Sequence, residues 1–218
     1  MAYRQIINKV LRRLREDTVD ADWIGSLSEN SEVDSYAQLI GDFINETKVS
    51  VEDAWQWSSL RSVVSVSTIA NTSLYAITGA IDRTKVLQVI DNTNNLQLKQ
   101  MSDSSFYKFK FTGSQASNAP IAFRLTGTSI EFYPTPDAVI DIKIHLVLPQ
   151  NDLTTADEIL TAPELPIVLG AYSLALAERG EDGGTGDNPA LVRFNSTLSD
   201  AITQDQNRTI DETVWYAS

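Results

Sequence analysis

The feature that most constrains the fold is a change in the spacing of apolar residues along the chain. Apolar residues recur every three or four positions before Arg61 and again after Pro149, whereas they alternate between these two points. The first spacing is typical of helices and the second of strands. Because the helices at both ends need partners, the simplest assembly packs them together around an inserted β segment. The sequence therefore predicts an α+β fold, a helical bundle formed by the N- and C-terminal helices with an inserted, mainly antiparallel β domain.

This order divides the 218 residues into four parts. Residues 1–61 are predicted to form the first part of the helical domain, residues 62–149 the inserted β domain, and residues 150–206 the second part of the helical domain. Residues 207–218 form a C-terminal tail. The length fits one large domain or a two-part single domain, since domains commonly have about 100 to 200 residues.

The first two helices are predicted from their apolar stripes. Ile6, Val10 and Leu14 lie four positions apart, and a second helix begins near Ser35. Trp55 and Trp57, at its end, are both expected to pack in the core. The inward stripe of the second helix is predicted to comprise Tyr36, Ile40, Phe43, Thr47, Val51, Ala54 and Trp55.

Two further helices follow the β segment. The stretch "TAPELPIVLGAYSLALAERG" is apolar nearly all round and stops at Gly180, the pattern of a buried helix. The last helix is predicted to begin at Asp187-Asn188-Pro189. Its apolar stripe comprises Leu191, Phe194, Leu198 and Ile202.

The β segment ends in a hairpin and a long strand. "PIAFRLTGTSIEFYP" predicts the hairpin, with Thr126-Gly127-Thr128 as its turn. In the strand that follows, the only histidine of the chain, His145, falls on the polar face. The opposite face carries Ile140, Ile142, Ile144, Leu146 and Leu148. The stretch "SDSSFYKFKF" fits either a short helix or a strand.

Charge and composition exclude several classes of function. A net charge of −12 argues against tight, sequence-independent DNA binding, because such binding needs Lys and Arg side chains to neutralise the DNA phosphates. The absence of cysteine excludes disulfides and thiolate zinc sites. No stretch resembles a signal peptide or a membrane helix, so we expect an intracellular protein. Arg12, Arg13 and Arg15 form a basic helix face, either solvated or in contact with an acidic partner.

No motif predicts chemistry. His145 has no second histidine and no nucleophile motif near it. Asp91 starts a calcium-like loop, but Leu96 stands where that loop requires glycine. The carboxylates of Asp157 and Glu158 are adjacent in sequence, which suits solvated charge. We therefore predict no catalytic residue, no cofactor and no metal.

Three stretches carry a resemblance to a known family: "FINETKVSVEDAWQWSSLRS", "SIEFYPTPD" and "LPIVLGAYSLALAERGED". Their order and spacing resemble the adaptor, or head-to-tail connector, proteins of short-tailed phages, of the tail tubular protein A kind. The resemblance implies a structural virion protein in the neck, made in the host cytoplasm. It also implies a ring, probably of twelve copies, that joins the portal protein to a tail nozzle or tail tube protein.

The resemblance carries further implications for partners. Phage DNA would pass through a channel in the ring during genome ejection without specific binding, and no membrane would be involved. Family members hold the portal with C-terminal segments. By position, the resemblance implies a portal or subunit interface at Ile210, Val214, Trp215 and Tyr216.

Two other functions remain open at this stage. A virion-associated cell-wall hydrolase would need two carboxylates facing each other across a cleft, and 29 acidic residues leave that possible. A β-sandwich-type binding module for a sugar or a protein would expose the aromatic side chains of "SSFYKFKF". The Trp215-Tyr216 pair also has a simpler alternative, which is packing on its own domain.

Overall fold

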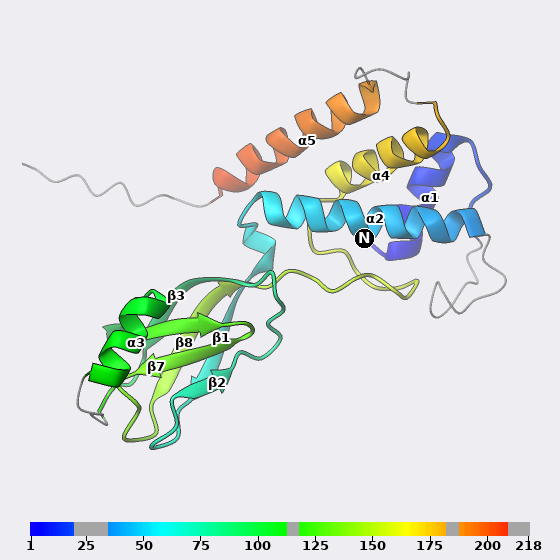
Figure 1. Cartoon of the computed structure of the whole chain (residues 1–218). Coiled ribbons are helices and arrows are strands. Elements are labelled where there is room, and N and C mark those ends of the chain that lie inside the picture. Colours follow the sequence, from blue (N-terminus) through cyan, green and yellow to red (C-terminus); the bar gives the residue numbers. More distant parts are fainter. Residues whose placement is uncertain (20–34, 113–117, 182–187, 209–218) are drawn as a thin grey trace, which may run out of the picture. The chain divides into compact units, whose positions relative to one another are not determined.

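The chain forms two compact units in a computed structural model that describes residues 1–19, 35–112, 118–181 and 188–208 (Figure 1). The helical unit comprises Met1–Leu60 and Gln150–Ser218, and the β unit comprises Arg61–Pro149. Helices and largely antiparallel sheets coexist in the one chain. The predicted α+β class is therefore confirmed.

The helical unit is built around one buried helix. Its helices are α1 (Tyr3–Leu14), α2 (Ser35–Ala54), α4 (Glu164–Glu178) and α5 (Pro189–Gln206), with a short 3-10 helix, η1 (Ser58–Leu60). Helix α4 packs against α1, α2 and α5. Because it has neighbours on several sides, α4 is apolar nearly all round, as predicted.

The buried side of α2 differs from the predicted stripe. Tyr36 and Phe43 are only partly buried and Ala54 is exposed. The buried positions are Ala37, Ile40, Gly41, Ile44, Thr47, Lys48, Val51 and Glu52. The prediction was wrong at these points because it counted apolar residues alone, whereas a lysine and a glutamate occupy two turns of the buried side.

Helix α5 begins as predicted. The side-chain oxygen of Asn188 accepts hydrogen bonds from the N–H groups of Ala190 and Leu191, and Pro189 opens the helix. Phe194 is partly buried, but Leu191 is exposed, so the predicted stripe was wrong at its first position. The buried side instead starts at Ala190, one position and about 100° away from Leu191 around the helix.

The β unit contains two four-stranded sheets. The first sheet has the order β1-β8-β3-β4, and its strands are β1 (Arg61–Ser67), β8 (Asp141–Val147), β3 (Lys85–Asp91) and β4 (Leu96–Gln97). The second has the order β2-β7-β6-β5, formed by β2 (Leu74–Ala76), β7 (Ser129–Tyr133), β6 (Ala122–Thr126) and β5 (Lys99–Gln100). Among the strand pairs of the described residues, only the short β5–β6 pair is parallel. Helix α3 (Asp103–Thr112) follows β5.

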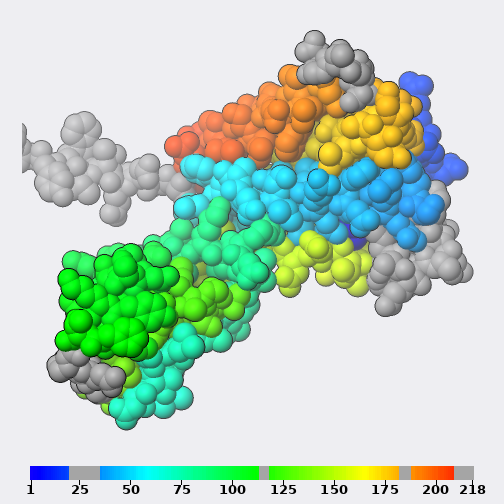
Figure 2. Space-filling model, viewed as in Figure 1, coloured from blue at the N-terminus to red at the C-terminus, as the bar shows by residue number. Residues whose placement is uncertain are grey.

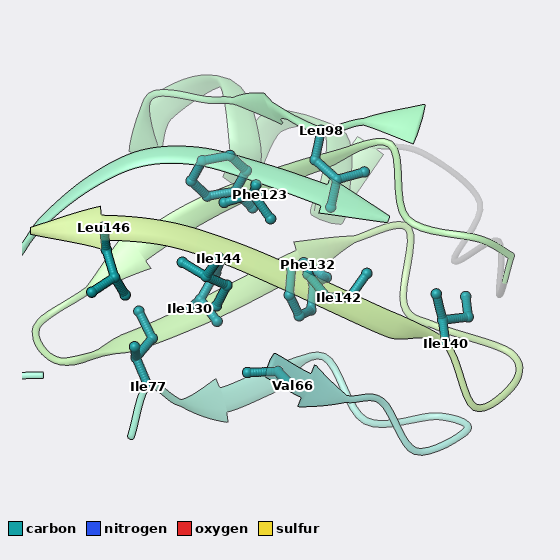
Figure 3. Close-up of a cluster of buried hydrophobic side chains, with 11 residues drawn as sticks. Val66, Ile77, Leu98, Phe123, Ile130, Phe132, Ile140, Ile142, Ile144 and Leu146 are labelled. Atoms are coloured by element: carbon teal, nitrogen blue, oxygen red, sulfur yellow. The ribbon is translucent and has the colours of Figure 1, made fainter. Parts of the chain in front are cut away.

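Side chains from both sheets share one core (Figure 3). Strand β8 contributes Ile142, Ile144 and Leu146, all fully buried, while His145 lies on the other face and is half-buried. Strands β6 and β7 contribute Phe123 and Phe132 from the opposite sheet. The predicted alternation of the long strand and the predicted hairpin are confirmed. The predicted turn was one residue too long, because Thr126 belongs to β6 and pairs with Ser129, which leaves Gly127-Thr128 as the turn.

Candidate interaction surfaces

The acidic residues singled out from the sequence hold turns. Asp91 is fully buried, and its Oδ1 accepts hydrogen bonds from the N–H groups of Thr93 and Asn94 at 3.0 and 2.9 Å. These bonds close the turn between β3 and β4, so they account for the calcium-like start of this stretch. Within the described ranges, no group of three or more His, Cys, Asp or Glu side chains is arranged to hold a metal ion.

Glu158 has a similar structural role. Its Oε2 accepts a hydrogen bond from the N–H of Thr155 at 2.8 Å. Burial alone would raise the pKa of Glu158, but hydrogen bonds from Thr155 and Thr154 lower it. Its neighbour Asp157 is exposed. Glu158 therefore orders a turn, and it does not face Asp157 across a cleft as the two carboxylates of a hydrolase would.

A buried polar cluster on α2 was missed from the sequence. Lys48 is fully buried, and its Nζ donates to the carbonyl oxygens of Gln150 and Asn151, both at 2.7 Å. Glu52 accepts a hydrogen bond from the N–H of Gln150. The amide of Asn45 both donates to and accepts from the backbone of Leu153. Together these side chains bind the segment that follows the β unit to α2, which gives "FINETK" a physical role.

A second polar cluster explains the Trp-x-Trp stretch. Trp57 is buried, and its indole N–H donates to the carbonyl of Val51 at 2.7 Å. Trp55 is partly buried, and its indole N–H donates to Oδ2 of Asp205 on α5. The N–H of Ser58 donates to the same oxygen at 2.9 Å. The two tryptophans are structural, and Asp205 fastens α5 to η1.

The basic helix face of α1 is exposed. Arg12, Arg13 and Arg15 are all open to solvent, and none of them forms an ion pair with a described residue. By contrast, Lys9 of the same helix pairs with Glu164. Cations near a helix C-terminus stabilise the helix dipole, so these arginines have a structural role. They also form a basic surface that an acidic partner can contact.

An ion pair holds α3 on the outer face of the second sheet. Arg124 of β6 lies opposite Glu131 of β7, and its Nε donates to Oε2 at 2.8 Å. From α3, Lys110 donates to the other oxygen of Glu131 at 2.5 Å. Burial opposes ionisation of Glu131, but its hydrogen bonds with Lys110 and Arg124 lower its pKa. The guanidinium of Arg124 also lies 4.4 Å from the ring centre of Tyr107.

Helix α3, green in Figure 2, lies at the surface of the β unit. It exposes large aromatic side chains. Phe111 is 76% exposed, and its ring stacks on that of Tyr107 with centres 5.6 Å apart. Phe109, on another side of the helix, contacts the ring of Tyr133. The stretch that fitted a helix or a strand is thus a helix. Its exposed aromatics match what the binding-module alternative required.

Beside α3 the surface is hollowed by a groove of about 440 Å³. We call it the α3 groove; its walls include Leu96, Lys99, Met101, Phe109, Ile121 and Tyr133. The predicted interface residues Ile210, Val214, Trp215 and Tyr216 lie outside the described residues.

These features have two kinds of role. The polar side chains described above either close a turn or fasten one element to another, and the exposed features are a basic helix face and an aromatic groove. None of the helices in the described ranges is long and apolar enough to cross a membrane. In the described ranges, the polar clusters thus hold the fold together, and the basic helix face and the α3 groove are the surfaces open to contact with other molecules.

Comparison with known protein families identifies the family of the chain. The sequence model of the family described as SU10 adaptor protein matches residues 1–215 of the chain. The chain therefore belongs to this family, which is a phage head-to-tail adaptor family. A search of curated proteins finds no match. The predicted family is confirmed, and the chain is a phage structural protein and virion component that contacts other head and tail components.

Proposed function

We propose that the chain forms an adaptor ring that joins the portal to the tail and encloses part of the DNA channel. The observation that carries this proposal is the match of the adaptor family over residues 1–215. The copy number proposed is twelve, and the further partners are the portal protein and a tail nozzle or tail tube protein. Helical units pack side by side around the channel, and β units face the tail.

The distribution of charge supports DNA passage over DNA binding. Residues 61–149 carry eight Lys or Arg and six Asp or Glu, a net +2, whereas the rest of the chain carries 9 and 23, a net −14. Twelve copies at −12 give a ring of −144. A channel lined by the acidic helical units repels phosphates and lets DNA slide during genome ejection.

Two sets of side chains are proposed to make the contacts between proteins. Arg12, Arg13 and Arg15 contact an acidic surface, either on a neighbouring acidic helical unit or on the portal. Ile210, Val214, Trp215 and Tyr216 form the portal or subunit interface. Buried aromatic anchors supply much of the binding energy at protein interfaces, which favours the Trp-Tyr pair for this role.

Native mass spectrometry of the chain mixed with the portal protein of the same phage tests the proposal. We expect an assembly that contains both proteins, with several copies of the chain for each portal. Arg13→Glu should weaken this assembly, whereas Arg193→Glu, the same charge reversal at an exposed position of α5, should not. A chain that stays monomeric and ignores the portal would refute the proposal.

The hydrolase alternative draws no support from the buried or hydrogen-bonded carboxylates Asp91, Glu131 and Glu158. Asp91 and Glu158 hold turns through backbone hydrogen bonds, and Glu131 is occupied by Arg124 and Lys110. Adaptor families are structural, so we do not propose an enzymatic reaction.

A further inference from the structure

The α3 groove is an apolar hollow among the described residues of the β unit. Three of its apolar side chains remain well exposed, with Leu96 at 41%, Phe109 at 49% and Ile121 at 55%. Single exposed apolar residues are common on protein surfaces, but a contiguous set lining a hollow marks a binding site. The volume of about 440 Å³ lies in the range of pockets that take compact ligands or a few large side chains.

The side chains that line the α3 groove indicate which kind of segment it can bind. Aromatic and aliphatic side chains dominate it, and Lys99 stands at its wall, exposed and without an ion pair to any described residue. The β unit as a whole carries a net +2. The groove is therefore complementary to a segment in which aromatic and aliphatic residues lie next to carboxylates.

The chain itself contains such a segment. Residues 209–218 read "TIDETVWYAS", which places Asp211 and Glu212 between Ile210 and the apolar run Val214, Trp215 and Tyr216. Ten residues can span at most about 33 to 36 Å, so the segment can reach another molecule from the end of α5. Its charge is opposite to that of the β unit.

We propose that the α3 groove binds residues 209–218 of a second copy of the chain. This inference rests on the proposed ring, and it selects the neighbouring subunit over the portal as the surface that receives Trp215 and Tyr216. The contact uses two different surfaces of one chain, a segment and a groove. Such a heterologous contact repeats identically from copy to copy, which is the type of contact that a ring requires, whereas binding within one copy joins nothing.

The first experiment measures binding of a labelled peptide, TIDETVWYAS, to the full chain by fluorescence anisotropy. The acceptor carries Trp215→Ala and Tyr216→Ala, so that its own segment does not compete. We expect saturable binding that Ile121→Glu in the same background weakens at least tenfold. Val139→Glu is the matched control, because Val139 is exposed in the same unit but does not line the groove.

Far-UV circular dichroism of each variant shows whether it is folded, and a Phe109→Ser acceptor replaces Ile121→Glu if that variant unfolds. A peptide that fails to bind, or that binds the folded groove variant as tightly as the control, overturns the proposal. A peptide of the same composition in scrambled order should bind at least tenfold more weakly.

The second experiment distinguishes binding between copies from binding within one copy. The Ile121→Glu chain has an intact C-terminal segment and a damaged groove. The Trp215→Ala, Tyr216→Ala chain has a damaged segment and an intact groove. We expect the two to form a mixed dimer in sedimentation velocity at concentrations above the peptide Kd, though each alone sediments as a monomer. A mixture that stays monomeric overturns the proposal. Neither experiment contains the portal protein. A negative result would therefore overturn this contact between copies without overturning the proposed binding of the chain to the portal.

Discussion

Gly170 of α4 lies close to Thr47 of α2 and Phe194 of α5, so Gly170→Ala tests the packing of the helical unit. A Cβ at this position would lie 2.3 Å from Cγ2 of Thr47 on α2 and 3.1 Å from two ring carbons of Phe194 on α5. The side chain of Thr47 is β-branched, so only two χ1 rotamers are favoured for it in a helix. The contact must therefore be relieved by a rotamer change at Thr47 or by a shift of a helix, and both cost free energy.

The size of the effect follows from two opposing contributions. In an exposed helix, Gly→Ala would stabilise the chain by about 1 kcal/mol. Overpacking a close-packed core costs about 1 to 3 kcal/mol, and a 2.3 Å contact with a stiff side chain places this case at the upper end. We therefore expect a net loss of about 1 to 2 kcal/mol in the free energy of unfolding.

Urea unfolding followed by tryptophan fluorescence measures this loss selectively. The four tryptophans lie at positions 23, 55, 57 and 215, and none lies within the β unit. The fluorescence therefore reports on the helical unit alone, and the urea midpoint should fall with little change in slope.

Thr47→Ala supplies the control, because it removes the methyl group that the new Cβ would meet. The double variant should lose much less stability than the sum of the two single losses, with a coupling of about 1 kcal/mol or more. If Gly170→Ala leaves the helical unit as stable as before or more stable, or if the two losses simply add, the packing described here is wrong.

Three further predictions concern buried polar groups. Oγ1 of Thr47 is buried without a hydrogen-bond partner, so Thr47→Val should raise the free energy of unfolding by about 1 kcal/mol in the same urea assay. Lys48→Met leaves two backbone carbonyls unpaired and should cost about 2 to 5 kcal/mol there. The pKa of Glu131 is lower in the folded chain than in the unfolded chain, where it is about 4.3. Its ion pairs should therefore stabilise the β unit fully at pH values above the unfolded pKa. This stabilisation should be lost as the pH falls through the folded pKa. Thermal unfolding followed by circular dichroism between pH 6 and pH 3 should show this loss, and Glu131→Gln should flatten it.

Much of the fold was predictable because apolar spacing reports directly on local structure. Strand β8 alternates so regularly that its buried face was evident, and the apolar circumference of α4 predicted its burial. The buried side of α2 was not predictable in the same way. Lys48 and Glu52 are buried there because a segment a hundred residues later supplies backbone partners for them, and no local pattern shows such a partner.

The surface features of the β unit also differed in how far the sequence alone could predict them. The pair of Arg124 and Glu131 was accessible from the sequence, since a hairpin that turns at Gly127-Thr128 places these two residues directly opposite. Helix α3 was ambiguous because Phe106 is its only fully buried residue, so its aromatic and lysine alternation fits a strand equally well. The α3 groove depends on how α3 lies on the sheet, which only the tertiary structure shows.

Negative-stain imaging of the chain mixed with portal protein tests the central claim most directly. The proposed adaptor role predicts that averaged images show a second ring added at one end of the portal, at an occupancy that saturates as the chain is titrated. Portal particles that remain unchanged at saturating concentrations, with the chain monomeric in the same sample, would contradict it.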